Sequence, residues 1–190
     1  MGEADVPDQI NVLGVAGSLR QGSYNKAALR AAIELAPAGM TIETFDLAPI
    51  QPYNEDVKQR GFPPAEQAFR EKIRAADALL FVTPEYNRGM PGVLKNAIDW
   101  ASRPPDQPFN GKPTAIFGAS TGLIGTAVAQ YELRRCLGVL NALVVNQPTV
   151  MIAQAGEKFD DEGRLTDEPT RKFVAQLLEA LAAWTRRLRA

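Results

Sequence analysis

A polar segment near the amino terminus has the residue types of a phosphate site. Gly17 to Asn25 reads Gly-Ser-Leu-Arg-Gln-Gly-Ser-Tyr-Asn and lies at the start of a predicted helix. The amino end of a helix presents free backbone N–H groups and the positive end of the helix dipole, which together attract phosphate. Ser18, Ser23 and Asn25 add neutral donors, and Arg20 adds a charged, forked donor. An ordinary serine and glycine turn that only caps the helix is the alternative interpretation.

Two common nucleotide-binding signatures are absent from this segment. Gly17 and Gly22 have the spacing of a P-loop, but Ser23 and Tyr24 stand where that motif requires Lys and then Ser or Thr. The dinucleotide pattern G-x-G-x-x-G is also missing, because Gly14 and Gly17 lie three residues apart. The sequence therefore disfavours hydrolysis of a nucleoside triphosphate and a standard Rossmann NAD site, and a terminal monophosphate is the favoured ligand.

Two later segments could bind a flat ring. Thr83 to Gly92 contains two prolines and two glycines, and its backbone N–H and C=O groups could contact the edge of a planar heterocycle. Within it, Tyr86 supplies an aromatic surface and Asn87 supplies both a donor and an acceptor. A proline-rich turn with polar surface residues is the alternative there. Gly118 to Gly125 is small enough to let a ring approach the backbone, and a plain strand-to-helix turn explains that segment equally well.

The composition of the chain narrows the possible chemistry. The 190 residues include no histidine and one cysteine, which excludes Ser-His and Cys-His catalytic pairs, histidine-ligated zinc or haem, and cysteine-ligated clusters. A net charge of -1 lacks the basic excess of a nucleic-acid binder. The first nine residues lack the layout of a signal peptide, and no apolar run approaches the roughly 20 residues of a membrane span. We expect one domain, residues 1–190, in the cytoplasm, without nucleic-acid or membrane partners.

The apolar runs predict the elements that position these segments. Strands are expected at residues 10–16, 40–47, 78–82, 113–118 and 139–146. Helices are expected at residues 23–35, 65–76, 91–102, 126–137 and 169–188. A long connection without apolar periodicity is expected at 48–64, and an irregular segment at 147–168.

Alternation of strands and helices predicts an α/β fold. The expected architecture is a flavodoxin-like three-layer sandwich, with a five-stranded parallel sheet in the order 2-1-3-4-5 and helices on both faces. Ligands in this fold bind beyond the carboxyl ends of the strands. The three polar segments follow the first, third and fourth predicted strands, so they are expected to meet at that edge of the sheet.

Three stretches of sequence resemble a known enzyme family. They are Gly-Ser-Leu-Arg-x-Gly-Ser-x-Asn at 17–25, Thr-Pro-Glu-Tyr-Asn at 83–87 and Pro-Gly-x-Leu-Lys-Asn-x-Ile-Asp-Trp-x-Ser-Arg at 91–103. In this order they resemble the NADPH-dependent FMN reductase family, and within it the soluble quinone, chromate and azo reductases. The resemblance implies tightly but non-covalently bound FMN and a homodimer or homotetramer. It also implies a ping-pong reaction, with hydride passing from NADPH or NADH to FMN and then electrons to a quinone-like acceptor.

The resemblance also implies which residues hold FMN. The phosphate would contact Ser18, Leu19, Arg20, Ser23, Tyr24 and Asn25. The isoalloxazine and ribityl chain would lie beside Pro84, Glu85, Tyr86 and Asn87, and Ser120 would close the far side of the ring. No catalytic side chain and no metal ligand is assigned, because the flavin carries the redox chemistry. Arg88 and Met90 occupy variable positions, so the acceptor preference of the family does not transfer.

Two other functions remain open from the sequence. A flavodoxin-type electron carrier would bind FMN without oxidising NADPH itself, although such carriers tend to be strongly acidic and this chain has a net charge of -1. A non-enzymatic interaction or sensor protein on the same fold would lack flavin. Residues 48–64 are the only support for that idea, and a subunit interface over the active site would explain them as well.

Overall fold

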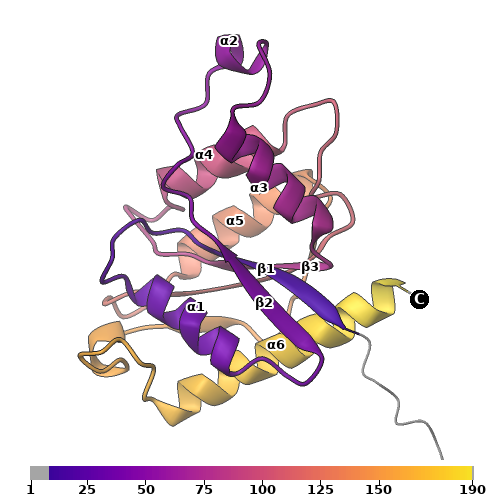
Figure 1. Ribbon diagram of the computed structural model, residues 1–190. Coiled ribbons are helices and arrows are strands. Elements are labelled where there is room, and N and C mark those ends of the chain that lie inside the picture. The colour runs from indigo at the N-terminus through magenta and orange to yellow at the C-terminus, as the bar shows by residue number, and fades with distance from the viewer. Residues whose placement is uncertain (1–8, 190) are drawn as a thin grey trace, which may run out of the picture.

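The computed structural model describes residues 9–189 and contains one parallel sheet between two layers of helices (Figure 1). The strand order is β2-β1-β3-β4-β5, and β6 also pairs with β4. The bounds are β1 Ile10–Ala16, β2 Met40–Phe45, β3 Ala78–Val82, β4 Pro113–Ala119, β5 Leu143–Val144 and β6 Val150–Ile152. All these pairs are parallel. The flavodoxin-like order predicted from the sequence is therefore confirmed.

The fifth strand position differs from the prediction. Residues 139–146 were expected to form one strand, but helix α5 continues to Val139 and the strand is limited to Leu143–Val144. A second short strand, β6, lies in the segment expected to be irregular and pairs with the carboxyl half of β4, beginning with Phe117 opposite Val150. A short continuous apolar run does not distinguish the end of a buried helix from a strand, which explains the error.

Helices cover both faces of the sheet, as Figure 1 shows. One face carries α1 (Tyr24–Glu34) and α6 (Glu168–Arg189), and the other carries α3 (Pro64–Ala75), α4 (Gly92–Ala101) and α5 (Ala127–Val139). The connection at 48–64 contains a short helix, α2 (Glu55–Lys58), which projects at the top of Figure 1, and a 3₁₀ turn follows β6 at Ala155–Glu157. Within residues 9–189 no helix has both the length and the apolar character that a membrane crossing requires.

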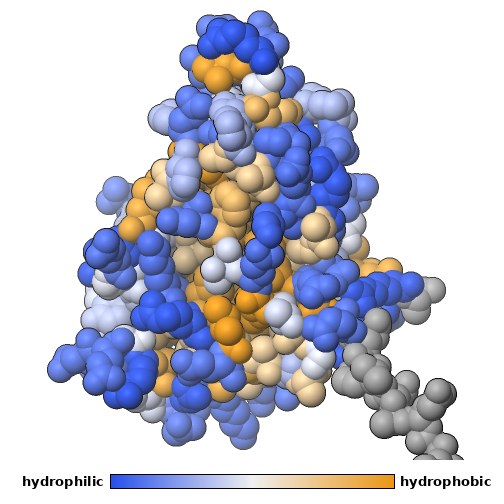
Figure 2. Space-filling view, viewed as in Figure 1, coloured by the Kyte–Doolittle hydropathy of each residue, from blue (hydrophilic) through white to orange (hydrophobic). Residues whose placement is uncertain are grey.

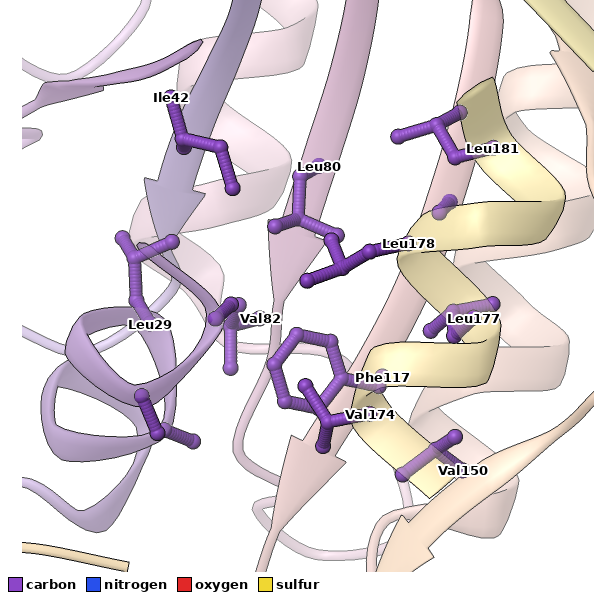
Figure 3. Packing of buried hydrophobic residues seen from close by; sticks show 14 of the residues in the cluster. Leu29, Ile42, Leu80, Val82, Phe117, Val150, Val174, Leu177, Leu178 and Leu181 are labelled. Carbon is purple, nitrogen blue, oxygen red and sulfur yellow. The ribbon is translucent and has the colours of Figure 1, made fainter. Parts of the chain in front are cut away.

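The central strands are buried on both faces. Every residue of β3 is 0% exposed, and alternate side chains contact opposite helical layers. Leu80 and Val82 belong to the cluster beneath α1 and α6, where Figure 3 shows them beside Phe117 and Leu178. Leu79 belongs to the other cluster, with α3, α4 and α5. Burial of each such side chain is worth about 1.5–3 kcal/mol, so the strands that end at the polar segments are held firmly.

The edge of the sheet at β2 is less completely covered. In Figure 2 hydrophobic residues gather in the middle of the face that carries β2, and hydrophilic residues lie around them. A shallow groove between α1 and β2 is lined in part by Leu29, Ile33 and Phe45. Within the described residues the β2 edge therefore pairs with no further strand and borders this groove.

Candidate functional site

Three loops meet at the carboxyl ends of β1, β3 and β4, toward the left of Figure 1. We call residues 17–23 loop 1, residues 83–91 loop 2 and residues 120–126 loop 3. Together they surround a cleft of about 320 Å³ that is lined by Ser18, Arg20, Ser23, Tyr24, Asn25, Pro84, Glu85, Tyr86, Ala119, Ser120 and Thr121. Of the predicted site residues, Leu19 and Asn87 lie outside this lining.

Loop 1 presents a row of unpaired backbone donors. The N–H of Gly17 donates to the carbonyl oxygen of Val82 at 2.9 Å, as the continuation of β1. The next seven N–H groups, from Ser18 to Tyr24, donate to no acceptor within residues 9–189. Ser23 caps α1 itself, because its Oγ accepts from the N–H groups of Asn25 at 3.1 Å and Lys26 at 3.4 Å. The loop can therefore surround an acceptor-only anion with amide hydrogens.

Arg20 adds a positive charge to this anion site. Its side chain lies over Tyr24, with 6.0 Å between the guanidinium carbon and the ring centroid. No carboxylate in the described part of the chain forms an ion pair with Arg20. A guanidinium that no carboxylate neutralises can form paired hydrogen bonds with phosphate oxygens.

The side chain of Asn25 is used within the protein. Its Nδ2 donates to the carbonyl oxygen of Ala119 at 2.9 Å, and its Oδ1 accepts from the N–H of Ala119 at 2.8 Å. Asn25 is only 3% exposed. The amide thus joins the start of α1 to the end of β4, which gives Asn25 a role in positioning loop 1 against loop 3.

Glu85 connects loop 2 to α5. Its Oε2 accepts from the N–H groups of Val128 at 2.9 Å and Ala129 at 3.0 Å. The residue before α5, Thr126, makes no capping side-chain bond, so Glu85 supplies the cap from another part of the chain. A carboxylate at this end of a helix also complements the helix dipole. The Glu85 side chain is 8% exposed and turned toward α5, so only part of the residue is available to the cleft.

A tight turn holds Tyr86 at the cleft. Tyr86 and Gly89 exchange backbone hydrogen bonds of 3.1 and 2.9 Å, and the two residues between them, Asn87 and Arg88, have φ values of 51° and 63°. The N–H of Met90, which follows Gly89, donates to Oε2 of Glu132 at 2.6 Å. This turn presents the ring of Tyr86, which is 55% exposed, and fixes the backbone on both sides of it.

The start of loop 2 and the end of loop 3 both lie against Gly118 of β4, where there is no room for a side chain. A Cβ on Gly118 would lie 2.0 Å from the carbonyl oxygen of Thr83 and 2.4 Å from Oγ1 of Thr126, so no other residue fits there. Beyond it, Ser120 donates its N–H to the carbonyl oxygen of Ile152 at 2.9 Å, and its Oγ accepts from Gly122 at 3.1 Å. Ser120 is therefore held at the edge of the cleft opposite loop 1.

A fourth segment supports the site and was missed from the sequence. Gln154 donates its N–H to Gly122 at 3.1 Å, and Ala155 donates to Ser120 at 3.0 Å, so the turn after β6 fixes loop 3. Phe159 packs on Tyr24, with 5.4 Å between the ring centroids. No motif marks these residues in the sequence, and only their contacts show their role. Ala119 and Thr121, which also line the cleft, are the neighbours of the predicted Ser120 in the third polar segment.

Potential metal ligands do not cluster in the described residues, and the single cysteine is a poor nucleophile. Among residues 9–189 there is no group of three His, Cys, Asp or Glu side chains that could hold a metal ion. Cys136 lies on α5, where burial raises the pKa of its thiol and so disfavours the reactive thiolate.

Comparison with known proteins settles the family. The family described as NADPH-dependent FMN reductase matches residues 10–157. This chain belongs to that family. Over 182 residues it is 62% identical to an NAD(P)H-dependent FMN reductase of Pseudomonas aeruginosa, covering 96% of this chain and 98% of the relative. It is also 43% identical to a 2-hydroxy-1,4-benzoquinone reductase of a Burkholderia species, covering 93% and 97% of the two chains.

A solved structure agrees with this assignment to the FMN reductase family. The flavoenzyme FerB of Paracoccus denitrificans, an NAD(P)H:(acceptor) oxidoreductase, superposes with a TM-score of 0.85. It is 34% identical in sequence, and the match covers 94% of this chain and 98% of FerB. Both the fold and the family inferred from the sequence stretches at 17–25, 83–87 and 91–103 are thus confirmed.

Proposed function

We propose that this protein is an FMN-dependent oxidoreductase that oxidises NADPH or NADH and reduces a quinone-like acceptor. In a chain of this family, one observation carries the proposal: seven consecutive N–H groups, from Ser18 in loop 1 to Tyr24 at the start of α1, find no acceptor within residues 9–189. Together with Arg20, they form a site suited to a terminal phosphate dianion. Family relatives named as FMN and quinone reductases support the same activity.

The residues around the cleft suit the rest of FMN as well. The phosphate would contact loop 1 through Ser18, Leu19, Arg20, Ser23 and Tyr24, and Asn25 would hold the loop in place. The isoalloxazine and the ribityl chain would lie between loop 2, at Pro84, Glu85, Tyr86 and Asn87, and loop 3, at Ser120. The N–H groups of Glu85 and Thr121 donate to nothing within residues 9–189, so they are available to the edge of a ring. When bound, FMN would accept hydride from the nicotinamide and return electrons to the acceptor.

The protein then contributes binding, orientation and electrostatics. Arg20 and the amino end of α1 offset the charge of the phosphate, and the rigid backbone of loops 2 and 3 orients the ring. Backbone donors at the ring edge stabilise negative charge that develops there during reduction. No side-chain acid or base is needed for the transfer of a hydride.

Visible spectroscopy of the purified protein tests this proposal. The protein as purified, or after addition of FMN, should show a bound-flavin spectrum that anaerobic NADPH bleaches and a quinone restores. Steady-state consumption of NADPH with a small quinone separates a reductase from a flavodoxin-type carrier, which would bind FMN but not oxidise NADPH. A protein that stays colourless in the presence of FMN would contradict the proposal.

We also propose how the molecule is organised in the cell. The proposal of one domain for the chain is supported by the packing of α1, α3, α4, α5 and α6 on the same sheet within residues 9–189. The use of reduced nicotinamide and the absence of a basic excess support a cytoplasmic enzyme without a nucleic-acid or membrane partner.

A homodimer or homotetramer is supported by apolar side chains that remain exposed beside the cleft, namely Leu123, Ile124, Val128 and Tyr131.

A further inference from the structure

The tip of loop 2 carries an arginine in an unfavourable backbone conformation. Asn87 and Arg88 are the two central residues of the turn, and both have positive φ values, 51° and 63°. Such turns favour Asn followed by Gly, because only glycine adopts the left-handed conformation without cost. Asn87 fits this preference, whereas Arg88 stands where glycine would be more stable. A strained residue that persists beside a binding cleft suggests that its side chain has a use.

The charge of Arg88 is free to meet a ligand. Its side chain is 69% exposed, and its Nη1 lies 3.7 Å from Oε1 of Glu85. Glu85 is already bonded to two N–H groups of α5, and Glu132 accepts from the backbone of Met90. Only the arginine end of this ion pair is exposed, and at 3.7 Å a pair whose cation is largely in water contributes little binding energy. The pair therefore holds the guanidinium near loop 2 without neutralising it strongly.

The two arginines of the site stand on different loops. Arg20 lies in loop 1, where the proposed function assigns it to the FMN phosphate. Arg88 lies in loop 2, on the same turn as Tyr86, whose ring lines the cleft. Arg88 is not itself a lining residue, but its positive charge lies on the loop assigned to the ring, two residues from Tyr86. The acceptor must bind near that ring to receive electrons.

We propose that Arg88 is a specificity-determining residue that favours electron acceptors bearing an anionic group, such as a quinone sulfonate or carboxylate. This inference rests on the proposed function. In the reaction the quinone would gain a hydride, which carries both electrons, and a proton from solvent, and would leave as the hydroquinone. The electrons come from the reduced nicotinamide by way of FMN. The anionic substituent pairs with Arg88 and does not react.

Two matched quinones test this proposal on the FMN-loaded enzyme. The probes are naphthoquinone-2-sulfonate, which is anionic, and 2-methylnaphthoquinone, which is neutral. Replacement Arg88→Gln should lower kcat/KM for the sulfonate by about 3–10-fold, as expected for an exposed charge-assisted contact, and leave the value for the neutral quinone unchanged. Arg88→Lys should retain most of the preference. Arg186→Gln, an exposed arginine in the last turn of α6, is the control and should change neither value.

Because the proposed reaction is ping-pong, the effect of a variant on the acceptor can be measured separately from its effect on NADPH. In such a reaction kcat/KM for the acceptor and kcat/KM for NADPH report different half-reactions. A loss confined to NADPH would overturn the proposal, because Arg88 would then recognise the nucleotide. An equal loss with both quinones would overturn it as well, since the charge would not be what matters. If the wild-type protein binds FMN but reduces neither quinone, the proposed function itself fails, which is a distinct result.

Replacement by glycine gives a second, independent readout. Arg88→Gly removes the charge and relieves the left-handed strain, so it should lose the preference for the sulfonate and raise Tm by about 1–3 °C. A lower Tm would indicate that Arg88 is retained for the fold and would overturn the proposal. Retained preference for the sulfonate in this variant would overturn it too.

Discussion

At the scale of single residues, Arg20 is the side chain whose charge most directly concerns the cofactor. Replacement Arg20→Ala should weaken FMN binding by about 1.5–3 kcal/mol, the range of a charge-assisted hydrogen bond. Titration of the apoprotein, followed by quenching of flavin fluorescence, measures the change. Riboflavin lacks the phosphate and is the matched ligand, so its affinity should be the same in both proteins. Equal FMN affinity in the variant and the wild type would contradict the assignment of Arg20 to the phosphate.

Asn25, in the first turn of α1 just after loop 1, has a different role. The resemblance of the sequence implied a contact with phosphate. In the structure, however, both the nitrogen and the oxygen of the Asn25 side-chain amide form hydrogen bonds with the backbone of Ala119. Replacement Asn25→Ala leaves the buried N–H and C=O of Ala119 without these partners and should lower the free energy of unfolding by about 1–3 kcal/mol. Urea unfolding of the apoprotein measures this loss. The exposed Asn110→Ala is the control, with an expected change within about 0.5 kcal/mol, and an equally small change for Asn25→Ala would contradict the positioning role.

At the scale of elements, α6 depends on an acidic cap. Oδ2 of Asp167 accepts from the N–H of Thr170 at 2.9 Å and from its hydroxyl group. These hydrogen bonds hold the pKa of Asp167 below its usual range. A carboxyl whose pKa is lower in the folded state stabilises the protein above the unfolded pKa, near 3.9, and loses this effect as the pH falls through the folded pKa.

Replacement of Asp167 tests this cap. Asp167→Ala should lower the free energy of unfolding by about 1 kcal/mol at pH 7, the usual value of a helix cap. The difference from the wild type should begin to shrink once the pH falls below about 4, because the carboxyl of the unfolded chain then takes up a proton. It should be smallest below the lowered pKa of the folded state, where the cap itself is protonated. Urea unfolding at several pH values measures both effects. If the difference in free energy of unfolding stays constant down to the lowest pH, the charge of Asp167 does not contribute to the stability of the helix.

The individual strands, loops and helix caps also show what could and could not be predicted from the sequence. β1 and β3 were placed correctly, because short apolar runs with glycine or polar residues after them specify buried strands. Loops 1 and 2 were found because their residue types are unusual at strand ends. β6 and the turn at Ala155–Glu157 carry no such signal, and their role depends on contacts with Ser120 and Gly122 that are distant in sequence. The capping of α5 by Glu85 was missed for the same reason, since 43 residues separate Glu85 from Val128.

At the scale of the whole molecule, the proposed self-association would use an apolar surface beside the cleft. Leu123 is 81% exposed and Tyr131 is 67% exposed, on loop 3 and on the first half of α5. A stable dimer buries about 800 Å² on each partner, and each Å² of apolar area contributes roughly 25 cal/mol. Charged residues at two such positions would have to be desolvated on association, which is costly.

If the protein assembles as proposed, the double variant Leu123→Asp with Tyr131→Asp should therefore be a monomer of 20.6 kDa. Light scattering after gel filtration measures the mass. Val139→Asp is the matched control, because Val139 is 84% exposed at the far end of the same helix, and this variant should keep the wild-type mass. If the interface covers the cleft, the monomeric variant should also bind FMN more weakly than the control. A monomeric wild-type protein, or an unchanged mass in the double variant, would contradict assembly through this surface.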